Sequence, residues 1–403
     1  MTFTIAVLGL AFLILIHEAG HFFVARALRM RPRRFYVGFP PAVLKTERNG
    51  IEYGLGAIPL GGYVKIPGMH RPAPSDVDSH LGRAVDEAPE LVAPVERVKR
   101  LLDHGEIAAA ASALPALRAS VREAELSPPT RRTAERGIQE VDDGLGPEAY
   151  WRAPAWKRIL VIGAGPGTNL VFAVVLFAAL FMLGGGDATR KVESVLPGTP
   201  AAEVGLRPDD RIIAIDTHLV TPETISERIA ASRGRPIMLL IERDGKLDSL
   251  GPVRAERQEG RYRLGFVLAG KELGAPTAAW KSLELTGLVT KEIGKSMARL
   301  VRGEGREDLA SPVGIVQGSS TALQAGVERY LWVLGLISLS LALLNLLPLL
   351  PLDGGHIAFS VVEGLRGRSV GREVYERVSA VGIAVVLLLF FVGLSNDIGR
   401  LGE

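Results

Sequence analysis

The chain contains no cysteine among its 403 residues. This absence excludes a fold stapled by disulfides, and it excludes a thiolate as metal ligand or nucleophile. The sequence also lacks a large charge of one sign, because its formal net charge is +3 and its arginine clusters are dispersed along the chain. We therefore expect no nucleic-acid partner.

The chain is instead rich in hydrophobic residues, which make up 47% of it although 23% of its residues are charged. The excess lies in four stretches that are nearly free of charge and long enough to cross a bilayer, which takes roughly 20 helical residues. These stretches are residues 2–16 continuing into 22–24, 159–186, 330–352 and 378–395. The expected fold class is a multi-pass α-helical membrane protein with about four transmembrane helices.

The flanks of these stretches predict how the chain crosses the membrane. The first stretch lacks the basic segment that opens a cleavable signal peptide, so we expect it to remain as a helix. Arginine and lysine cluster after the first stretch, before the second, and between the third and fourth. By the positive-inside rule these loops are cytoplasmic, and both termini and the segment between stretches two and three are extracytoplasmic.

Two regions precede the second stretch. Residues 35–45 and 51–66 have the pattern of short β segments punctuated by glycine and proline, typical of hairpins next to the membrane. Residues 71–150 are rich in Ala, Glu and Arg, and predict two helices that turn at His104-Gly105, followed by a polar linker through Pro128-Pro129. We expect this region to be a cytoplasmic insert, either a plain helical hairpin or a module that docks a partner.

Residues 191–270 have the pattern of a small α+β domain. Strands are expected at 192–196, 211–216, 236–243 and 263–268, and helices at 200–204 and 222–232. The string PGTPAAEVGLRPDDRIIAID resembles bacterial PDZ domains, whose loop usually carries Gly-Asp where this chain has Asp209-Asp210. The resemblance implies binding of a peptide or chain end by strand addition, with Leu264-Gly265-Phe266 as the candidate carboxylate-binding loop.

The next segment, residues 278–301, has apolar residues at helical spacing. Such a helix is expected either to lie in the membrane interface or to pack on the outer domain.

The first apolar stretch ends in the motif His17-Glu18-Ala19-Gly20-His21. It matches H-E-x-x-H, in which two imidazoles four residues apart point to one side of a helix and can bind one metal ion. Neutral imidazoles suit zinc, and a catalytic zinc keeps three protein ligands and one position for water, from which Glu18 can take a proton as general base. On a soluble helix an exposed polar patch would be a competing interpretation, but ionisable groups in an apolar span are unfavourable unless a metal or partners satisfy them.

A third ligand should come from another span, and the third stretch ends in NLLPLLPLDGGH, residues 345–356. Pro348 and Pro351 break the helix there, and irregular backbone at membrane depth is tolerated only beside protein or a water-filled cavity. Asp353 is the candidate oxygen ligand, with N-cap of the following helix as its alternative role. His356 is either another candidate ligand or a residue at the start of that helix.

Together these motifs resemble the site-2 protease family of intramembrane zinc metalloproteases. The likeness rests on HEAGH, IPLGGYVK at 58–65, AGPGTN at 164–169, the PDZ-like domain, SPVGI at 311–315 and NLLPLLPLDGGH. They follow in order over nearly the whole chain, except the 71–150 insert. Among the branches of the family, the chain is most similar to bacterial proteases with four spans and one PDZ domain, as found among actinobacterial regulators of sigma-factor signalling.

The resemblance implies roles for the site residues. His17, His21 and Asp353 would bind one zinc ion per chain, with Glu18 as the catalytic base. Asn345, with Pro348 near it, would position the substrate or steady the developing oxyanion, as a side-chain amide donor can.

The resemblance also matches Gly61-Gly62 with a membrane-reentrant β hairpin, whose edge could pair with an unwound substrate strand. Asn169 either packs near the site or makes a helix–helix hydrogen bond.

The implied function is hydrolysis of peptide bonds within or near transmembrane segments in the bacterial inner membrane. Single-span proteins such as anti-sigma factors, and remnant signal peptides, are the implied substrates, and the PDZ-like domain would lie outside the cytoplasm. The expected domains are residues 1–70 with the first transmembrane helix and reentrant hairpin, the 71–150 insert, 151–187 with the second transmembrane helix, the PDZ-like 188–272, the amphipathic interfacial 273–327, and 328–403 with the last two transmembrane helices.

Two other functions fit part of the pattern. A transporter or channel would line a pathway with intramembrane ionisable groups, but beyond one H-E-x-x-H the spans offer only Asp353 and His356. A catalytically silent membrane scaffold would keep a structural zinc site and use its PDZ domain for partners, but such a site has no need of Glu18 as a base.

Overall fold

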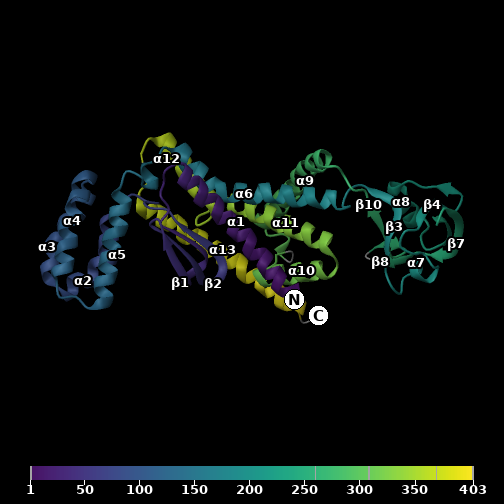
Figure 1. Cartoon of the computed structure of the whole chain (residues 1–403), viewed down its shortest axis with the longest axis horizontal. Helices are drawn as coiled ribbons and strands as arrows, with labels where there is room; N and C mark the ends of the chain where they lie inside the picture. The colour runs from purple at the N-terminus through teal and green to yellow at the C-terminus, as the bar shows by residue number, and fades with distance from the viewer. Residues whose placement is uncertain (1, 259, 307–308, 369, 402–403) are drawn as a thin grey trace. The chain divides into compact units, whose positions relative to one another are not determined.

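The structure is a computed structural model that describes residues 2–258, 260–306, 309–368 and 370–401. Its elements are labelled in Figure 1. They belong to two compact units, one comprising residues 1–172, 292–324 and 336–403 and the other comprising residues 173–291 and 325–335.

Four helices are long and apolar enough to cross a membrane, as the sequence predicts. They are α1 (Thr2–Ala27), α6 (Ala155–Met182), α11 (Val327–Asn345) and the segment Glu373–Gly399 of α13 (Arg372–Leu401). The helix α1 continues through His17 and His21. The third span ends at Asn345 instead of residue 352, because the two prolines that follow cannot continue the helical hydrogen bonds, and α12 (Asp353–Arg366) begins after this break.

Polar contacts between helices bring the site-bearing turns together. The hydroxyl of Thr168 on α6 donates to the carbonyl of Ile16 on α1 over 3.0 Å. On the next residue of α6, the Asn169 carbonyl accepts from Ser338 Oγ of α11 over 2.8 Å. Small polar residues of this kind let helix backbones approach closely within a bilayer.

The predicted β segments form one small sheet next to α1. They are two strands of 15 residues, β1 (Arg34–Arg48) and β2 (Ile51–Lys65), that bend so that residues 34–37 are flanked by 52–55 on one side and 62–65 on the other. Residues 62–65, which we call the outer strand, have no further strand beside them in the described chain. Phe22 of α1 packs its ring against Phe35 and Tyr53, with centroids 5.0 and 6.0 Å away.

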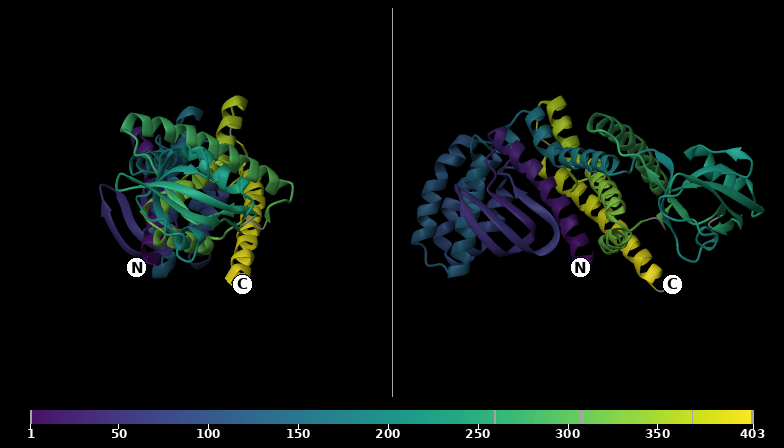
Figure 2. Two further views of the ribbon diagram at one scale, coloured as in Figure 1. Left: turned by 90° about the vertical axis from the view of Figure 1, so that its right-hand side faces the viewer. Right: turned by 45° about the vertical axis from the view of Figure 1, so that its right-hand side comes forward.

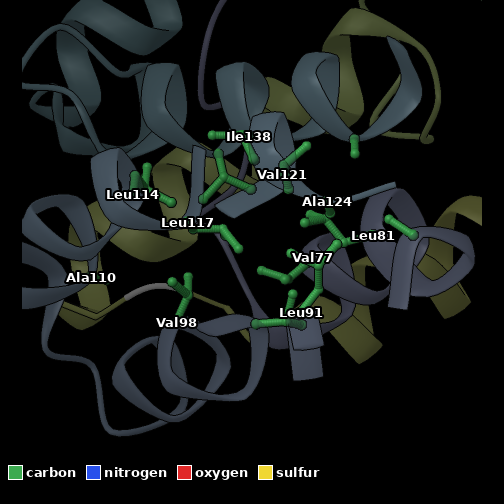
Figure 3. Close-up of a cluster of buried hydrophobic side chains, with 14 of the residues drawn as sticks. Val77, Leu81, Leu91, Val98, Ala110, Leu114, Leu117, Val121, Ala124 and Ile138 are labelled. Carbon is green, nitrogen blue, oxygen red and sulfur yellow. The ribbon is translucent and has the colours of Figure 1, made fainter. Parts of the chain in front are cut away.

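The insert is a bundle of four helices, not two helices and a linker. They are α2 (Pro74–Glu87), α3 (Val92–Asp103), α4 (Ile107–Glu123) and α5 (Pro128–Leu145), with short 3-10 turns at Pro89–Leu91 and Tyr150–Arg152. The expected turn at His104-Gly105 joins α3 to α4. The linker prediction was wrong because proline is well tolerated in the first turn of a helix, where Pro128 and Pro129 lie. Figure 3 shows the bundle's core, which includes Leu81, Leu117 and Ile138.

Charged pairs fasten α5 to the sheet. Arg33 donates from Nε and Nη2 to the two carboxylate oxygens of Asp143, over 3.0 and 2.6 Å. Lys65, the last residue of the outer strand, pairs with Glu140 of the same helix. The sheet and the insert helices lie side by side in Figures 1 and 2. The insert is therefore attached to the strand that runs past the site.

The SPVGI motif lies at the start of α10 (Pro312–Gln324). This helix contacts the end of α13 and the beginning of α1. The backbone N–H groups of Ser311 and Gly314 donate to Asp397 Oδ2 of α13, over 2.8 and 3.1 Å. At the other end of α10, Ser320 Oγ donates to the Thr2 hydroxyl over 3.2 Å. The beginning of α1 and the end of α13 thus lie on the same side, as Figures 1 and 2 show.

The second unit contains an antiparallel sheet in the order β10-β3-β4-β6-β7. The helix α9 (Ala275–Val301), where the sequence predicts an amphipathic segment, follows this sheet. The sheet and its neighbouring elements are β3 (Ala188–Val195), α7 (Pro200–Glu203), β4 (Arg211–Ile215), β5 (His218–Leu219), α8 (Pro222–Ala231), β6 (Pro236–Arg243), β7 (Lys246–Arg254), β8 (Glu256–Gln258), β9 (Arg261–Arg263) and β10 (Phe266–Gly270).

Two features of this sheet differ from expectation. The strand expected at 263–268 is divided into β9 and β10, and β7 was not predicted because its side chains are mostly polar and exposed. In the loop before β4, Asp209 has a φ of +73°, the left-handed region that glycine enters freely. The loop therefore keeps a glycine-type backbone although aspartate stands there.

Candidate metal centre

Three donor atoms from two elements converge inside the first unit. His17 and His21 lie one turn apart on α1, both buried, with their Nε2 atoms 3.3 Å apart. Asp353, the first residue of α12, places Oδ2 at 3.1 Å from His17 Nε2 and 3.4 Å from His21 Nε2. The break after Asn345 brings this carboxylate to the imidazoles.

The spacing of these atoms fits a tetrahedral zinc ion. Bonds of 2.0–2.1 Å give a tetrahedron whose edges are about 3.3 Å long, and the three measured separations lie on either side of that length. Asp353 Oδ2 is buried and has no hydrogen-bond partner among the described residues, so its lone pairs are available to a metal ion. The described chain holds no second cluster of three such ligands. The alternative role of Asp353 is wrong, because Leu352 is the N-cap and no side chain caps the helix.

Neighbouring groups orient the two imidazoles. His21 Nδ1 lies 2.9 Å from the carbonyl oxygen of Val161 on α6 and donates to it, which leaves Nε2 free to ligate. His17 Nδ1 lies 3.3 Å from the side-chain amide nitrogen of Asn169, which is fully buried. The sequence predicts either packing near the site or a helix–helix hydrogen bond for Asn169. The structure shows both, because the side chain contacts His17 and the backbone carbonyl accepts a hydrogen bond from α11.

The AGPGTN motif contributes one more residue that the sequence did not single out. A Cβ atom at Gly165 would lie 2.2 Å from His21 Nε2 and 2.8 Å from His17 Nε2. Both distances are far below van der Waals contact, so only glycine lets α6 pass this close to the donor atoms. The motif marked the region, but the packing that requires glycine is visible only in the structure.

Glu18 and the outer strand share the wall of a cavity next to the donor atoms. A Cβ atom on Gly62 would lie 2.2 Å from Glu18 Cγ, and the preceding Gly61 has a φ of +106°, so both glycines are needed for this approach. The cavity has a volume of about 360 Å³, and its lining includes His17, Glu18, His21, Gly62, Tyr63, Val64, Asn345, Pro351, Asp353 and His356.

The residues of the NLLPLLPLDGGH segment differ in their distance from the cavity. Asn345 lines it and donates from Nδ2 to the carbonyl of Leu341 over 3.0 Å. Pro348 is exposed, and Pro351 lines the cavity in its place. His356 also lines the cavity but is not one of the three clustered donors. The Tyr375 hydroxyl lies 2.6 Å from His356 Nδ1.

The candidate peptide-binding loop belongs to the second unit. Leu264 is buried in the core of that unit, and the Gly265 carbonyl accepts from the Leu196 N–H over 2.9 Å. Phe266 begins β10, an edge strand whose only sheet partner in the described chain is β3. If a peptide adds here, it meets the backbone edge of β10 and not the Leu264 side chain.

Comparisons with known proteins agree with this geometry. The model of "Peptidase family M50" matches residues 5–389 of the chain. A protein of Brucella suis named "Putative zinc metalloprotease" is 30% identical, with 96% of this chain and 93% of the relative aligned. A protein of Lactococcus lactis with the same description is 26% identical, and one of Enterococcus faecalis named "Probable protease eep" is 25% identical, each with 96% of both chains aligned.

Proposed function

The chain belongs to peptidase family M50, and on this premise we propose that it is an intramembrane metallopeptidase that holds one zinc ion between His17, His21 and Asp353. The observation that carries the proposal is the convergence of these three donor atoms, at 3.1–3.4 Å from one another, on helices that include a span of the membrane. The names of the relatives from Brucella suis and Lactococcus lactis support zinc as the metal.

Glu18 is the proposed general base. A zinc ion bound here would act as a Lewis acid and lower the pKa of a coordinated water. Glu18, which faces the same cavity as the three ligands, would accept a proton from the attacking water and return it to the leaving amine. The backbone of Gly62 packs closely against the Glu18 side chain and limits where the carboxylate can lie. The amide of Asn345 lines the cavity and can donate to a carbonyl that develops negative charge.

The outer strand is the proposed docking edge for the substrate. A transmembrane helix hides its carbonyls in its own hydrogen bonds, so a segment must unwind before hydrolysis. Residues Gly62, Tyr63 and Val64 line the cavity at the unpaired edge of the sheet. An unwound segment can replace its lost hydrogen bonds by pairing with such an edge.

The finer parts of the proposal concern substrate and location. We propose single-span membrane proteins, such as anti-sigma factors, and remnant signal peptides as substrates, in the bacterial inner membrane. The α+β domain would be PDZ-like and extracytoplasmic, and would read a peptide or chain end, while the insert would be cytoplasmic. The arginine-rich loops support this sidedness.

The test is a Glu18→Gln variant in proteoliposomes with a single-span model substrate. Glutamine keeps the shape but cannot accept the proton, so we expect cleavage to fall by about 10²–10⁴-fold with zinc content unchanged. A wild-type protein that bound zinc but cleaved no substrate, and a Glu18→Gln variant that kept every cellular function, would instead support the silent scaffold.

A further inference from the structure

We infer that Asn169 is a positioning residue whose side-chain oxygen fixes the tautomer of His17. The inference rests on the proposed zinc site. It starts from a difference between the two imidazoles, because His21 Nδ1 has the carbonyl of Val161 as its acceptor, whereas His17 Nδ1 faces the Asn169 amide. An imidazole that ligates through Nε2 carries its proton on Nδ1 and needs an acceptor there.

The amide of Asn169 supplies that acceptor after a half turn of its plane. The Asn169 Nδ2 atom lies 3.3 Å from His17 Nδ1. If His17 ligates through Nε2, both of these nitrogen atoms are donors and cannot bond to each other. The Oδ1 atom of Asn169 is meanwhile buried and has no hydrogen-bond partner in the described chain. The nitrogen and oxygen of an amide are exchanged by rotating it by half a turn, which puts Oδ1 where it accepts from Nδ1. One rotation therefore gives the His17 Nδ1–H an acceptor and pairs Oδ1, while Nδ2 takes the place that Oδ1 held.

The backbone around Asn169 holds the amide in reach of His17. The Asn169 carbonyl accepts from Ser338 Oγ, and the adjacent Thr168 donates to Ile16, so bonds to α11 and α1 fix this turn of α6. Gly165, four residues earlier on the same face, passes directly against both Nε2 atoms. The helix–helix bond uses the backbone, and the side chain is left for His17.

The experiment measures zinc affinity by chelator competition on the full-length protein in detergent. Asn169→Leu keeps the size and removes the acceptor, so we expect affinity to fall by about 10–100-fold, the usual effect of losing the partner of a ligating histidine. Asn169→Asp keeps an acceptor and should bind zinc at least as tightly as wild type. Ser338→Ala is the matched control, because it removes a buried hydrogen bond to the backbone of the same residue and leaves the Asn169 side chain in place, so its loss of affinity should be clearly smaller than that of Asn169→Leu.

Three results would overturn the inference: an affinity for Asn169→Leu within about twofold of wild type, an equal loss in Ser338→Ala, or weaker binding by Asn169→Asp. If the leucine variant does not fold, the aspartate variant and the control decide alone. A wild-type protein without zinc would instead contradict the proposed function itself.

Discussion

At the residue scale, the glycine at position 165 gives a direct test of the packing around the donor atoms. Gly165→Ala would put a methyl group 2.2 Å from His21 Nε2, so either the imidazole or α6 must move. We expect zinc affinity to fall by at least about tenfold, comparable to the loss of a group that orients a ligand. Gly167→Ala, two residues further along the same helix, is the control, since its Cβ would meet no atom within 4 Å. Equal zinc binding by both variants would contradict the described packing.

A second residue-scale prediction concerns Asp210 in the second unit. Burial would raise the pKa of this carboxyl, but the two hydrogen bonds from Arg243, each 2.7 Å long, and the Arg207 N–H hold it below its ordinary value of 3.8. A lowered native pKa means that the stabilisation is fully present above pH 3.8 and is lost as the pH falls from there through the native pKa.

Asp210→Asn should therefore destabilise the sheet by about 1.5–3 kcal/mol at neutral pH, the range for hydrogen bonds to charged groups. The difference from wild type should shrink as the pH falls below 3.8. Hydrogen–deuterium exchange of β4 and β6 in the full-length protein measures it. A difference that stays constant over this range would show that the charge of Asp210 contributes nothing.

Only the part of the site made of chemically distinctive side chains could be predicted from the sequence. His17, Glu18, His21 and Asp353 are unusual in apolar segments, and that is why the sequence identified them. The carbonyl of Val161 is a backbone group of a kind that every sequence offers. Its role depends on which turns of α1 and α6 meet, and packing decides that.

At the element scale, the attachment of α5 to the sheet can be tested by comparing two variants, each of which lacks one ion pair. Arg33→Ala removes a bidentate ion pair with Asp143, whose side chain is only 13% exposed. This loss should weaken the attachment of α5 by about 1–2 kcal/mol. Arg31→Ala removes a bond to Glu148 in which both side chains are largely exposed, and should have an effect below about 0.5 kcal/mol.

Hydrogen–deuterium exchange over α5 and residues 62–65 measures this difference. Faster exchange in Arg33→Ala than in Arg31→Ala is the expected result, because Arg33 holds α5 through Asp143 and donates its backbone N–H to the carbonyl of Lys65 in the outer strand. Unchanged protection in both variants would mean that the helix is held by its apolar contacts alone.

Elements were predictable where local signals decide them. The four apolar helices follow from length and composition, and the turn at His104-Gly105 follows from its glycine. The start of α5 at Pro128-Pro129 was missed because the same residues suit a linker and a first helical turn. The folding back of β1 and β2 was missed because strand pairing depends on contacts distant in sequence.

At the scale of the whole molecule, the site depends on segments more than 300 residues apart in the chain. Helix α1 brings two imidazoles and α12 brings the carboxylate, and the match to peptidase family M50 extends over residues 5–389, which contain both. A soluble fragment would lack one side of the site. The complete site therefore requires the whole chain, held in a membrane or in detergent.

The most direct measurement is the zinc content of the detergent-purified full-length protein, compared with that of Asp353→Ala. About one zinc ion per wild-type chain, and a clear loss in the variant, is the result predicted for a site with three protein ligands. A wild-type protein that takes up no stoichiometric zinc when the metal is supplied, or a variant that retains it fully, would contradict the proposed site.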